Sequence, residues 1–250
     1  MVPLIKPATA GPPLNRLLAA FPPQTLTVLQ PSLSHIVLVQ GEVCFAAGDP
    51  IQRVYFPTSG LISLVIDMDQ GDLVETGLVG REGAAGLQSA FGPRFSFTRA
   101  VVQMSGTFYA IAAEALRRAI NDSEAARAVI EHYTELLWAE AQQVAACNAL
   151  HPANSRLARW LLQAADRAGT EQLSLTQEFI GEMLGIRRTS VTLLAQDLQR
   201  RGVIKYSRGK IAILNRETLE GCACDCYGIV KGLYREVSMR SKATLRTVGA

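Results

Sequence analysis

The most informative stretch of this 250-residue sequence is TQEFIGEMLGIRRTSVTLLAQDLQRRGVIKYSRGKIAIL, residues 176–214. Its first part predicts a short helix, because Thr176 is a favourable N-cap and apolar residues follow it at helical spacing. Gly185 then permits a tight turn, and a second helix is expected over residues 188–201. Two apolar runs joined by a basic turn at residues 207–210 predict a β-hairpin. Two short helices, a glycine turn and a hairpin together predict a winged helix-turn-helix.

The formal net charge is only +3, but the basic residues are unevenly spread along the chain. Residues 151–250 hold sixteen basic and nine acidic side chains, and the densest basic segment lies between Gly185 and Lys210. Asp197 is the only acidic residue of that segment. Its basic residues are Arg187, Arg188, Arg200, Arg201, Lys205, Arg208 and Lys210. Charge alone would fit a solvated basic surface. The same charge on a helix-turn-helix with a wing indicates that the partner is DNA.

A helix-turn-helix binds DNA by placing the start of its second helix in the major groove. Polar side chains at that end would meet base edges, and an arginine there could donate two hydrogen bonds to guanine. The basic residues of the hairpin would contact phosphates, which position the protein without reading the sequence. The predicted DNA-contacting residues are Thr176, Arg187, Arg188, Thr189, Ser190, Thr192, Lys205, Arg208 and Lys210.

The first half of the chain has a different pattern. Short apolar or β-branched runs recur over residues 34–110, and turn residues such as Gly48-Asp49-Pro50 separate them. The runs are Ile36–Val39, Val54–Phe56, Leu61–Ile66, Leu73–Val79, Val101–Met104 and Phe108–Ile111. Many short strands at this spacing are typical of a β-sandwich or barrel. The chain is therefore predicted to be an α+β protein.

The apolar spacing becomes helical between these two regions, where no glycine or proline occurs from Ala112 to Leu150. A helix of about 25 residues is expected to begin near Asn121 or Ser123 and to end before His151-Pro152. Its apolar stripe consists of Ile130, Tyr133, Leu137, Ala141 and Val144. This stripe could pack on the β domain, but we favour a homodimer seam, because symmetric dimers are the commonest oligomers.

The run from Thr176 to Val191 resembles the helix-turn-helix of Crp–Fnr transcription regulators. In that family the recognition helix opens with Arg, a variable residue, Thr or Ser, and then Val. Arg188, Thr189, Ser190 and Val191 match this frame, so the resemblance implies that Arg188 reads a base. Many members have Glu where this chain has Thr189, which implies a different operator sequence.

The resemblance covers roughly residues 14–220 and implies a complete regulator. The implied fold is a cyclic-nucleotide-binding-like β-roll of jelly-roll type, a dimerisation helix and a winged helix. The implied partners are promoter DNA, a second copy of the chain and RNA polymerase. The corresponding segments are a flexible extension over 1–13, a sensor domain over 14–120, the dimerisation helix over 121–150, the DNA-binding domain over 151–227 and a tail over 228–250.

The sensor departs from the cyclic-nucleotide-binding pattern of this family. Binders carry Gly-Glu-Leu followed by Arg-Ser/Thr-Ala, in which Arg balances the cyclic phosphate and Glu holds the ribose. The corresponding candidate pocket residues here are Gly83, Ala84, Ala85, Gly86, Leu87, Arg94 and Arg99. No Glu follows Gly83, and Phe95 follows Arg94 in place of a small hydroxyl residue. We therefore do not expect cyclic AMP as the effector. The arginines could instead be surface or strand-end residues.

The five cysteines form no obvious disulfide framework. Cys222, Cys224 and Cys226 alternate, and thiolates this close could bind a metal or sense oxidants. The sequence shows no fourth ligand nearby. Reduced, partly packed thiols at the end of the winged helix are the alternative that we favour, so no metal is expected.

Enzymatic and membrane functions are not indicated. His35, His132 and His151 lie far apart, whereas a cupin-type metal enzyme needs clustered histidines. No export signal or bilayer-spanning apolar run is apparent, which favours a cytoplasmic protein without membrane contact. Two alternatives remain. One is a small-molecule sensor that acts through a protein partner, and the other is a regulator with a degenerate sensor that is controlled by its abundance.

Overall fold

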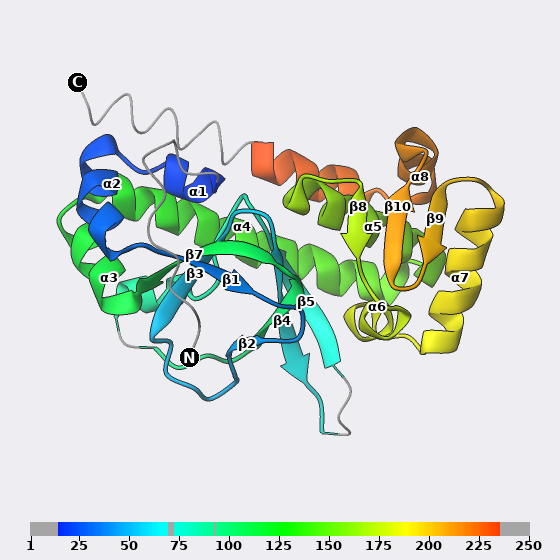
Figure 1. Cartoon of the computed structure of the whole chain (residues 1–250), viewed down its shortest axis with the longest axis horizontal. Helices are drawn as coiled ribbons and strands as arrows, with labels where there is room; N and C mark the ends of the chain where they lie inside the picture. Colours follow the sequence, from blue (N-terminus) through cyan, green and yellow to red (C-terminus); the bar gives the residue numbers. More distant parts are fainter. Residues whose placement is uncertain (1–14, 70–72, 93, 236–250) are drawn as a thin grey trace.

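The computed structural model describes residues 15–69, 73–92 and 94–235 (Figure 1). It contains a strand-rich N-terminal lobe and a C-terminal winged lobe, and one long helix, α4, reaches from the first lobe into the second. The predicted flexible extension over 1–13 lies outside the described residues, as does the part of the predicted tail beyond Arg235.

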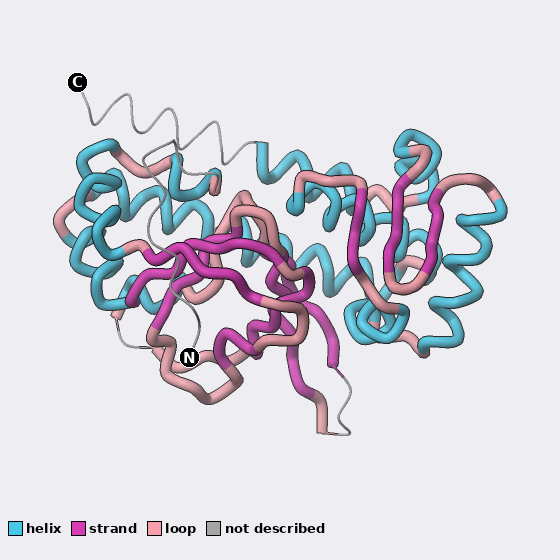
Figure 2. The backbone as a smooth tube through the Cα atoms, viewed as in Figure 1, coloured by secondary structure: helices cyan, strands magenta, loops and turns pink. Residues whose placement is uncertain are grey.

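The N-terminal lobe is built from two antiparallel sheets (Figure 2). One has the strand order β1-β7-β3 and the other β2-β6-β4-β5. The strands are β1 (Ser34–Leu38), β2 (Val43–Phe45), β3 (Arg53–Pro57), β4 (Leu61–Asp67), β5 (Leu73–Val79), β6 (Arg99–Met104) and β7 (Gly106–Ala112). Ile36 and Phe108 from the first sheet share a buried cluster with Ile62 and Val102 from the second. The predicted β-roll is confirmed, and β2 is a strand that the sequence pattern did not indicate.

Short helices cover one end of this roll. They are α1 (Arg16–Ala19), α2 (Pro23–Leu29), η1 (Gln30–Ser32), η2 (Leu87–Phe91) and α3 (Ala113–Asn121). Asn15 caps α1, because its side chain accepts a hydrogen bond from the Leu18 amide. The buried side chains of Leu18, Leu29 and Leu116 join the roll to these helices in a second cluster.

Helix α4 (Glu124–Leu150) has 27 residues, close to the predicted length, and Ser123 caps its start. Three of the five residues predicted for the dimer seam pack within this chain instead. Ile130 and Tyr133 are fully or almost fully buried in the cluster at the end of the roll, and Leu137 packs against the same cluster. The first half of the stripe therefore stabilises this chain's own core, because the end of the roll offers it an apolar surface. Ala141 and Val144, farther along, are half-buried.

The C-terminal lobe is a winged helix. Its elements are α5 (Ala153–Ala168), β8 (Gln172–Ser174), α6 (Gln177–Leu184), α7 (Arg188–Arg200), β9 (Ile204–Ser207), β10 (Lys210–Ile213) and α8 (Arg216–Cys222). The three strands form one antiparallel sheet in the order β8-β10-β9. Gly169 ends α5 in a left-handed conformation, as the sequence predicts. A further helix follows and covers residues 226–235, so the beginning of the predicted tail is helical.

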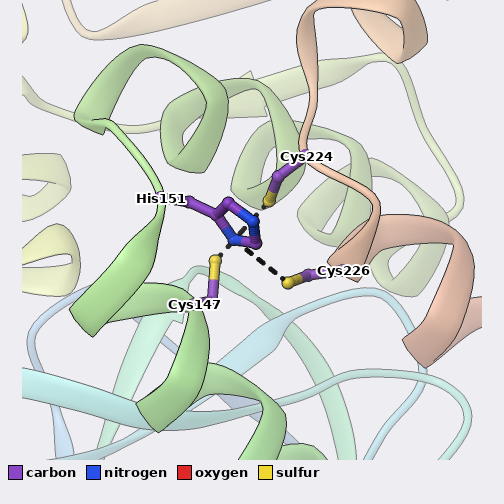
Figure 3. Close-up of side chains that lie close together, drawn as sticks. All are labelled: Cys147, His151, Cys224 and Cys226. Carbon is purple, nitrogen blue, oxygen red and sulfur yellow. Dashed lines mark hydrogen bonds between the residues drawn. The ribbon is translucent and has the colours of Figure 1, made fainter.

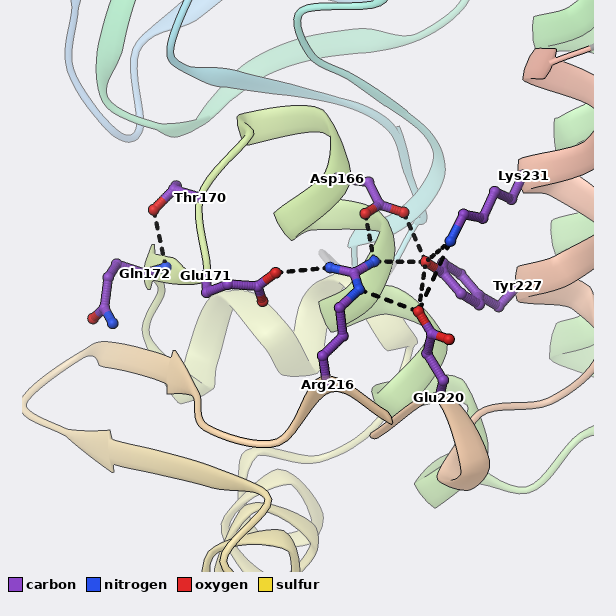
Figure 4. Close-up of polar contacts among 8 residues, drawn as sticks. All are labelled: Asp166, Thr170, Glu171, Gln172, Arg216, Glu220, Tyr227 and Lys231. Atoms are coloured by element: carbon purple, nitrogen blue, oxygen red, sulfur yellow. Dashed lines mark hydrogen bonds and ion pairs between the residues drawn. The ribbon is translucent and has the colours of Figure 1, made fainter. Parts of the chain in front are cut away.

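Arg216 fastens α8 to the rest of the lobe (Figure 4). Its guanidinium donates to Asp166 at 2.5 Å, to Glu171 at 2.8 Å and to the Tyr227 hydroxyl at 2.7 Å. Tyr227 donates in turn to the other Asp166 oxygen at 2.8 Å. This partly buried network holds α5, α8 and the helix over 226–235 together.

Among the described residues, no helix is both long and apolar enough to cross a membrane.

Candidate nucleic-acid interface

The helix-turn-helix forms where the sequence predicts it. The Thr176 hydroxyl accepts a hydrogen bond from the Phe179 amide at 3.2 Å and so caps α6. Gly185 adopts the left-handed conformation with φ +60°, which lets the chain reverse between the helices. Val191, Ala195 and Leu198 form the buried face of α7. The opposite face of α7 is left exposed.

The N-terminal end of α7 carries the predicted base-reading residues. Arg187, Arg188 and Thr189 are exposed, and Ser190 is half-buried. Arg188 lines a cavity of about 390 Å³ together with Gln177 at the start of α6 and Arg208 at the tip of the wing. The helix end and the wing therefore border one concave surface.

Thr192 also makes contacts within the winged lobe. Its hydroxyl donates to Gln177 Oε1 at 2.8 Å and to the Arg188 carbonyl at 3.1 Å, so it fastens α7 to α6. Leu193, which is 66 % exposed, projects from α7 instead. An apolar side chain at this place could contact a thymine methyl group. The position lies four residues after Thr189, one helical turn away, and this spacing is the signal by which the sequence could have indicated it.

The wing is a hairpin of β9 and β10 with a two-residue turn. Arg208 and Gly209 both have positive φ, +50° and +72°, as a type I′ turn requires. The Tyr206 hydroxyl donates to the Leu175 carbonyl at 3.1 Å and holds the hairpin against the lobe. Lys205, Arg208 and Lys210 are all exposed. The structure thus gathers the predicted phosphate contacts at one end of the lobe, next to α7.

The predicted effector residues do not form a comparable site. Ala84, Ala85 and Leu87 are buried in the apolar core of the roll. Arg94 is exposed, and its guanidinium donates to the Phe91 carbonyl at 3.3 Å. Arg99 begins β6 and pairs with Asp67 at 2.7 Å. Both arginines therefore lie at the surface, which agrees with the alternative interpretation of the sequence.

The space beside Gly83 is filled by another side chain. A Cβ atom placed on Gly83 would lie only 1.6 Å from the Tyr133 hydroxyl oxygen. A tyrosine from α4 therefore lies directly against the loop in which cyclic-nucleotide binders carry their ligand-holding residues.

Buried polar groups connect this sensor lobe to the winged lobe. Arg167 on α5 pairs with Glu140 on α4 at 2.7 Å and with Glu82 at 3.6 Å, and it also donates to the Leu78 carbonyl. Tyr234 adds a hydrogen bond to Glu140 at 2.8 Å. A charge network made from four segments of the chain thus lies where the two lobes meet. No sequence pattern indicates this network, because its members are up to 152 positions apart.

The three alternating cysteines do not lie together. Cys222 lies apart, and its sulfur accepts a hydrogen bond from Arg201 at 3.1 Å. Cys224 and Cys226 instead face Cys147 and His151, which the sequence pattern did not connect with them (Figure 3).

Two family models match this chain. The model for the cyclic nucleotide-binding domain matches residues 35–123, and the model for the Crp-like helix-turn-helix domain matches residues 155–222. Both matches coincide with the lobes described above, in the order in which Crp-type regulators carry them. The chain belongs to the Crp–Fnr family.

One curated relative is similar to this chain in sequence, and solved structures are similar to it in fold. The chain is 26 % identical over 212 residues to the CRP-like cAMP-activated global transcriptional regulator of Mycobacterium tuberculosis, covering 79 % of this chain and 91 % of that one. Its fold is similar to that of FixK2 from Bradyrhizobium japonicum, with a TM-score of 0.67, 18 % identity and coverage of 77 % and 98 %. It is also similar to the c-di-GMP responsive regulator CLP from Xanthomonas campestris, with a TM-score of 0.62, 15 % identity and coverage of 76 % and 98 %.

This Crp–Fnr protein is therefore a transcription regulator with a helix-turn-helix DNA-binding domain. The family consists of regulators and not of enzymes, so the prediction that the chain is not an enzyme is confirmed. The resemblance inferred from Thr176 to Val191 is confirmed as well, because these residues lie inside the matched helix-turn-helix domain.

Proposed function

We propose that the protein is a homodimer that binds an inverted-repeat promoter sequence, with α7 in the major groove and the wing on the phosphates. The observation that carries this proposal is the exposed Arg187–Thr189 end of α7, next to a wing with three exposed basic residues. A basic helix end beside a basic hairpin supplies both base contacts and phosphate contacts. We place the protein in the cytoplasm, where promoter DNA and RNA polymerase, its proposed further partner, are found.

The proposed dimer seam is the outer face of α4. Thr134, Trp138 and Ala145 are exposed on this face and Ala141 is half-buried, at steps of four, three and four residues. Such spacing is typical of two helices that pack along their length. Trp138 is 69 % exposed near the middle of the helix, which is costly for so large an apolar side chain in a single chain. A second copy of α4 would cover it.

We do not propose cyclic AMP as the effector. The mycobacterial relative is named as cAMP-activated and the Xanthomonas regulator as c-di-GMP responsive, so relatives of this chain respond to different nucleotides. In this chain Ala84 is buried in the core, Arg94 is a surface residue and Tyr133 lies against Gly83. These features support a sensor that binds another molecule or that has lost ligand control.

The salt dependence of DNA binding tests the proposed interface. On a random-sequence duplex, Lys210→Ala should reduce the slope of log affinity against log salt by about 0.9, because one phosphate contact is lost. Arg127→Ala is the matched control, since Arg127 is an exposed basic residue on α4, away from the wing. Equal slopes for wild type and Lys210→Ala would overturn the wing assignment. Absence of any DNA binding would favour the alternative, a sensor acting through a protein partner.

A further inference from the structure

Three cysteines and a histidine converge where α4 ends (Figure 3). Cys147 lies in the last turn of α4, and His151 follows four residues later, at its C-cap. Cys224 lies in the short connection between α8 and the helix over 226–235. Cys226 lies at the start of that helix. The potential ligand atoms of all four side chains lie within 4.8 Å of one another.

The distances suit a tetrahedral metal ion. The sulfurs of Cys147 and Cys224 are 3.5 Å apart, and the Cys226 sulfur is 3.4 Å from His151 Nδ1. With zinc–sulfur bonds of about 2.3 Å and a zinc–nitrogen bond of about 2.0–2.1 Å, neighbouring ligand atoms of a tetrahedron are about 3.6–3.8 Å apart. A small adjustment of side chains would therefore give all four ligands a common zinc ion.

The surroundings of the cluster also suit a zinc site. His151 directs Nδ1 at Cys226, and its Nε2 lies 3.5 Å from the Asp225 carboxylate, which could orient the ring as second-layer carboxylates do in zinc sites. Gln143 donates a hydrogen bond to the Cys226 sulfur at 3.0 Å. The positive charge of the buried Arg159 acts on both Cys147 and Cys224. Three thiolates around Zn²⁺ carry one net negative charge, which this guanidinium would offset.

We propose that Cys147, His151, Cys224 and Cys226 bind one Zn²⁺ ion in a closed structural site. Four protein ligands of the Cys₃His type leave no open position for a substrate, which is the arrangement of structural zinc sites. The ion joins the end of α4 to the chain segment after α8. It therefore fixes the helix of the proposed dimer seam to the DNA-binding lobe, at the place where His151-Pro152 interrupts the helical path. Each ligand thiol releases its proton on binding the metal.

The first test is the metal content of the full-length, tag-free protein purified without chelators, measured by inductively coupled plasma mass spectrometry. We expect about one zinc per chain in the wild type. Cys226→Ser and Cys224→Ser should lose it. Cys222→Ser is the matched control, because Cys222 belongs to the same alternating run but contacts Arg201 instead of the cluster, and it should keep the zinc. Equal zinc in all four proteins would overturn the assignment, as would iron accompanied by inorganic sulfide.

A second test uses only the wild-type protein and so does not depend on the folding of a variant. The native chain is stripped of metal with a chelator under reducing conditions and then titrated with Co²⁺. The expected result is the intense visible absorption of tetrahedral, thiolate-bound cobalt, reaching its maximum at one equivalent and disappearing when Zn²⁺ is added. The pale spectrum of octahedral cobalt, or a Cys147–Cys224 disulfide in the purified protein, would overturn the proposal.

Discussion

Glu75 is a buried carboxyl group at the contact between the two lobes. It lies on β5 and accepts hydrogen bonds from the Ser63 hydroxyl at 2.6 Å and from the Trp160 indole of α5 at 2.7 Å. Burial raises the pKa of Glu75 to about 7, although the two hydrogen bonds act in the opposite direction. The folded protein therefore holds a proton on Glu75 at pH values at which the unfolded chain has released it.

The contribution of Glu75 to the stability of the protein should consequently fall as pH rises from about 4.5 to about 7. Below this window the carboxyl group is neutral in both states, and above it the folded state carries a buried charge. Glu75→Gln removes this dependence. The change in unfolding free energy that it causes should be more favourable at pH 8 than at pH 4 by about 3 kcal/mol. Urea unfolding of both proteins at several pH values measures the difference. Parallel pH profiles would show that Glu75 titrates normally.

Arg188 is the side chain on which sequence recognition is expected to depend most. Arg188→Ala should weaken binding to the preferred sequence by about 1–3 kcal/mol, roughly 5- to 150-fold, because a bidentate base contact is lost. Binding to random DNA should weaken much less. Arg208→Ala at the tip of the wing removes the same charge and should weaken both kinds of binding alike. Competition titrations measure this, and equal losses on both DNAs for Arg188→Ala would count against base reading.

Helix α4 has two faces with different tasks. Its inner face stabilises the chain itself, since Ile130 and Tyr133 are buried in the core at the end of the roll. Its outer face presents Trp138, which the proposed second copy would cover.

Trp138→Glu should therefore separate the dimer into single chains, because it places a charge in the middle of the seam. Sedimentation velocity at micromolar concentration should report two chains per particle for the wild type and one for the variant. Val28→Glu, which puts the same charge on an exposed apolar residue of α2, is the control and should remain dimeric. A monomeric wild type, or a dimeric Trp138→Glu protein, would contradict the proposed seam.

Elements set by local signals were predictable from the sequence. Thr176 and Gly185 mark the ends of α6, and the turn at Arg208-Gly209 marks the wing, because caps and turns depend on neighbouring residues. The three-residue strands β2 and β8 were missed, since so few residues show no periodicity. The buried face of α4 was assigned to the wrong partner, because an apolar stripe indicates burial without saying what buries it.

In the whole molecule the two lobes share a core. Leu61, Val65 and Leu78 of the sensor sheet belong to the same buried cluster as Leu157 and Trp160 of the winged lobe. The Arg167 network adds buried charge pairs at this contact. A displacement of one lobe would break these pairs and leave charges buried, which is unfavourable. The contact therefore favours one fixed arrangement of the lobes.

Contacts between residues that are far apart in the sequence could be found only from the three-dimensional structure. Cys147 and Cys224 are 77 positions apart, and Glu75 and Trp160 are 85 apart. Neither pair has a spacing pattern, since folding and not local geometry brings them together. The sequence could indicate the DNA-contacting residues because one short segment supplies nearly all of them.

Sequence-specific binding by a homodimer can be tested by selecting bound sequences from a random DNA pool. The selection uses the wild-type protein at physiological salt without added ligand. We expect enrichment of an inverted repeat whose half-sites are about one helical turn apart, because two copies of α7 enter successive major grooves on one side of the duplex. Enrichment of a single half-site, or of half-sites in direct repeat, would contradict it.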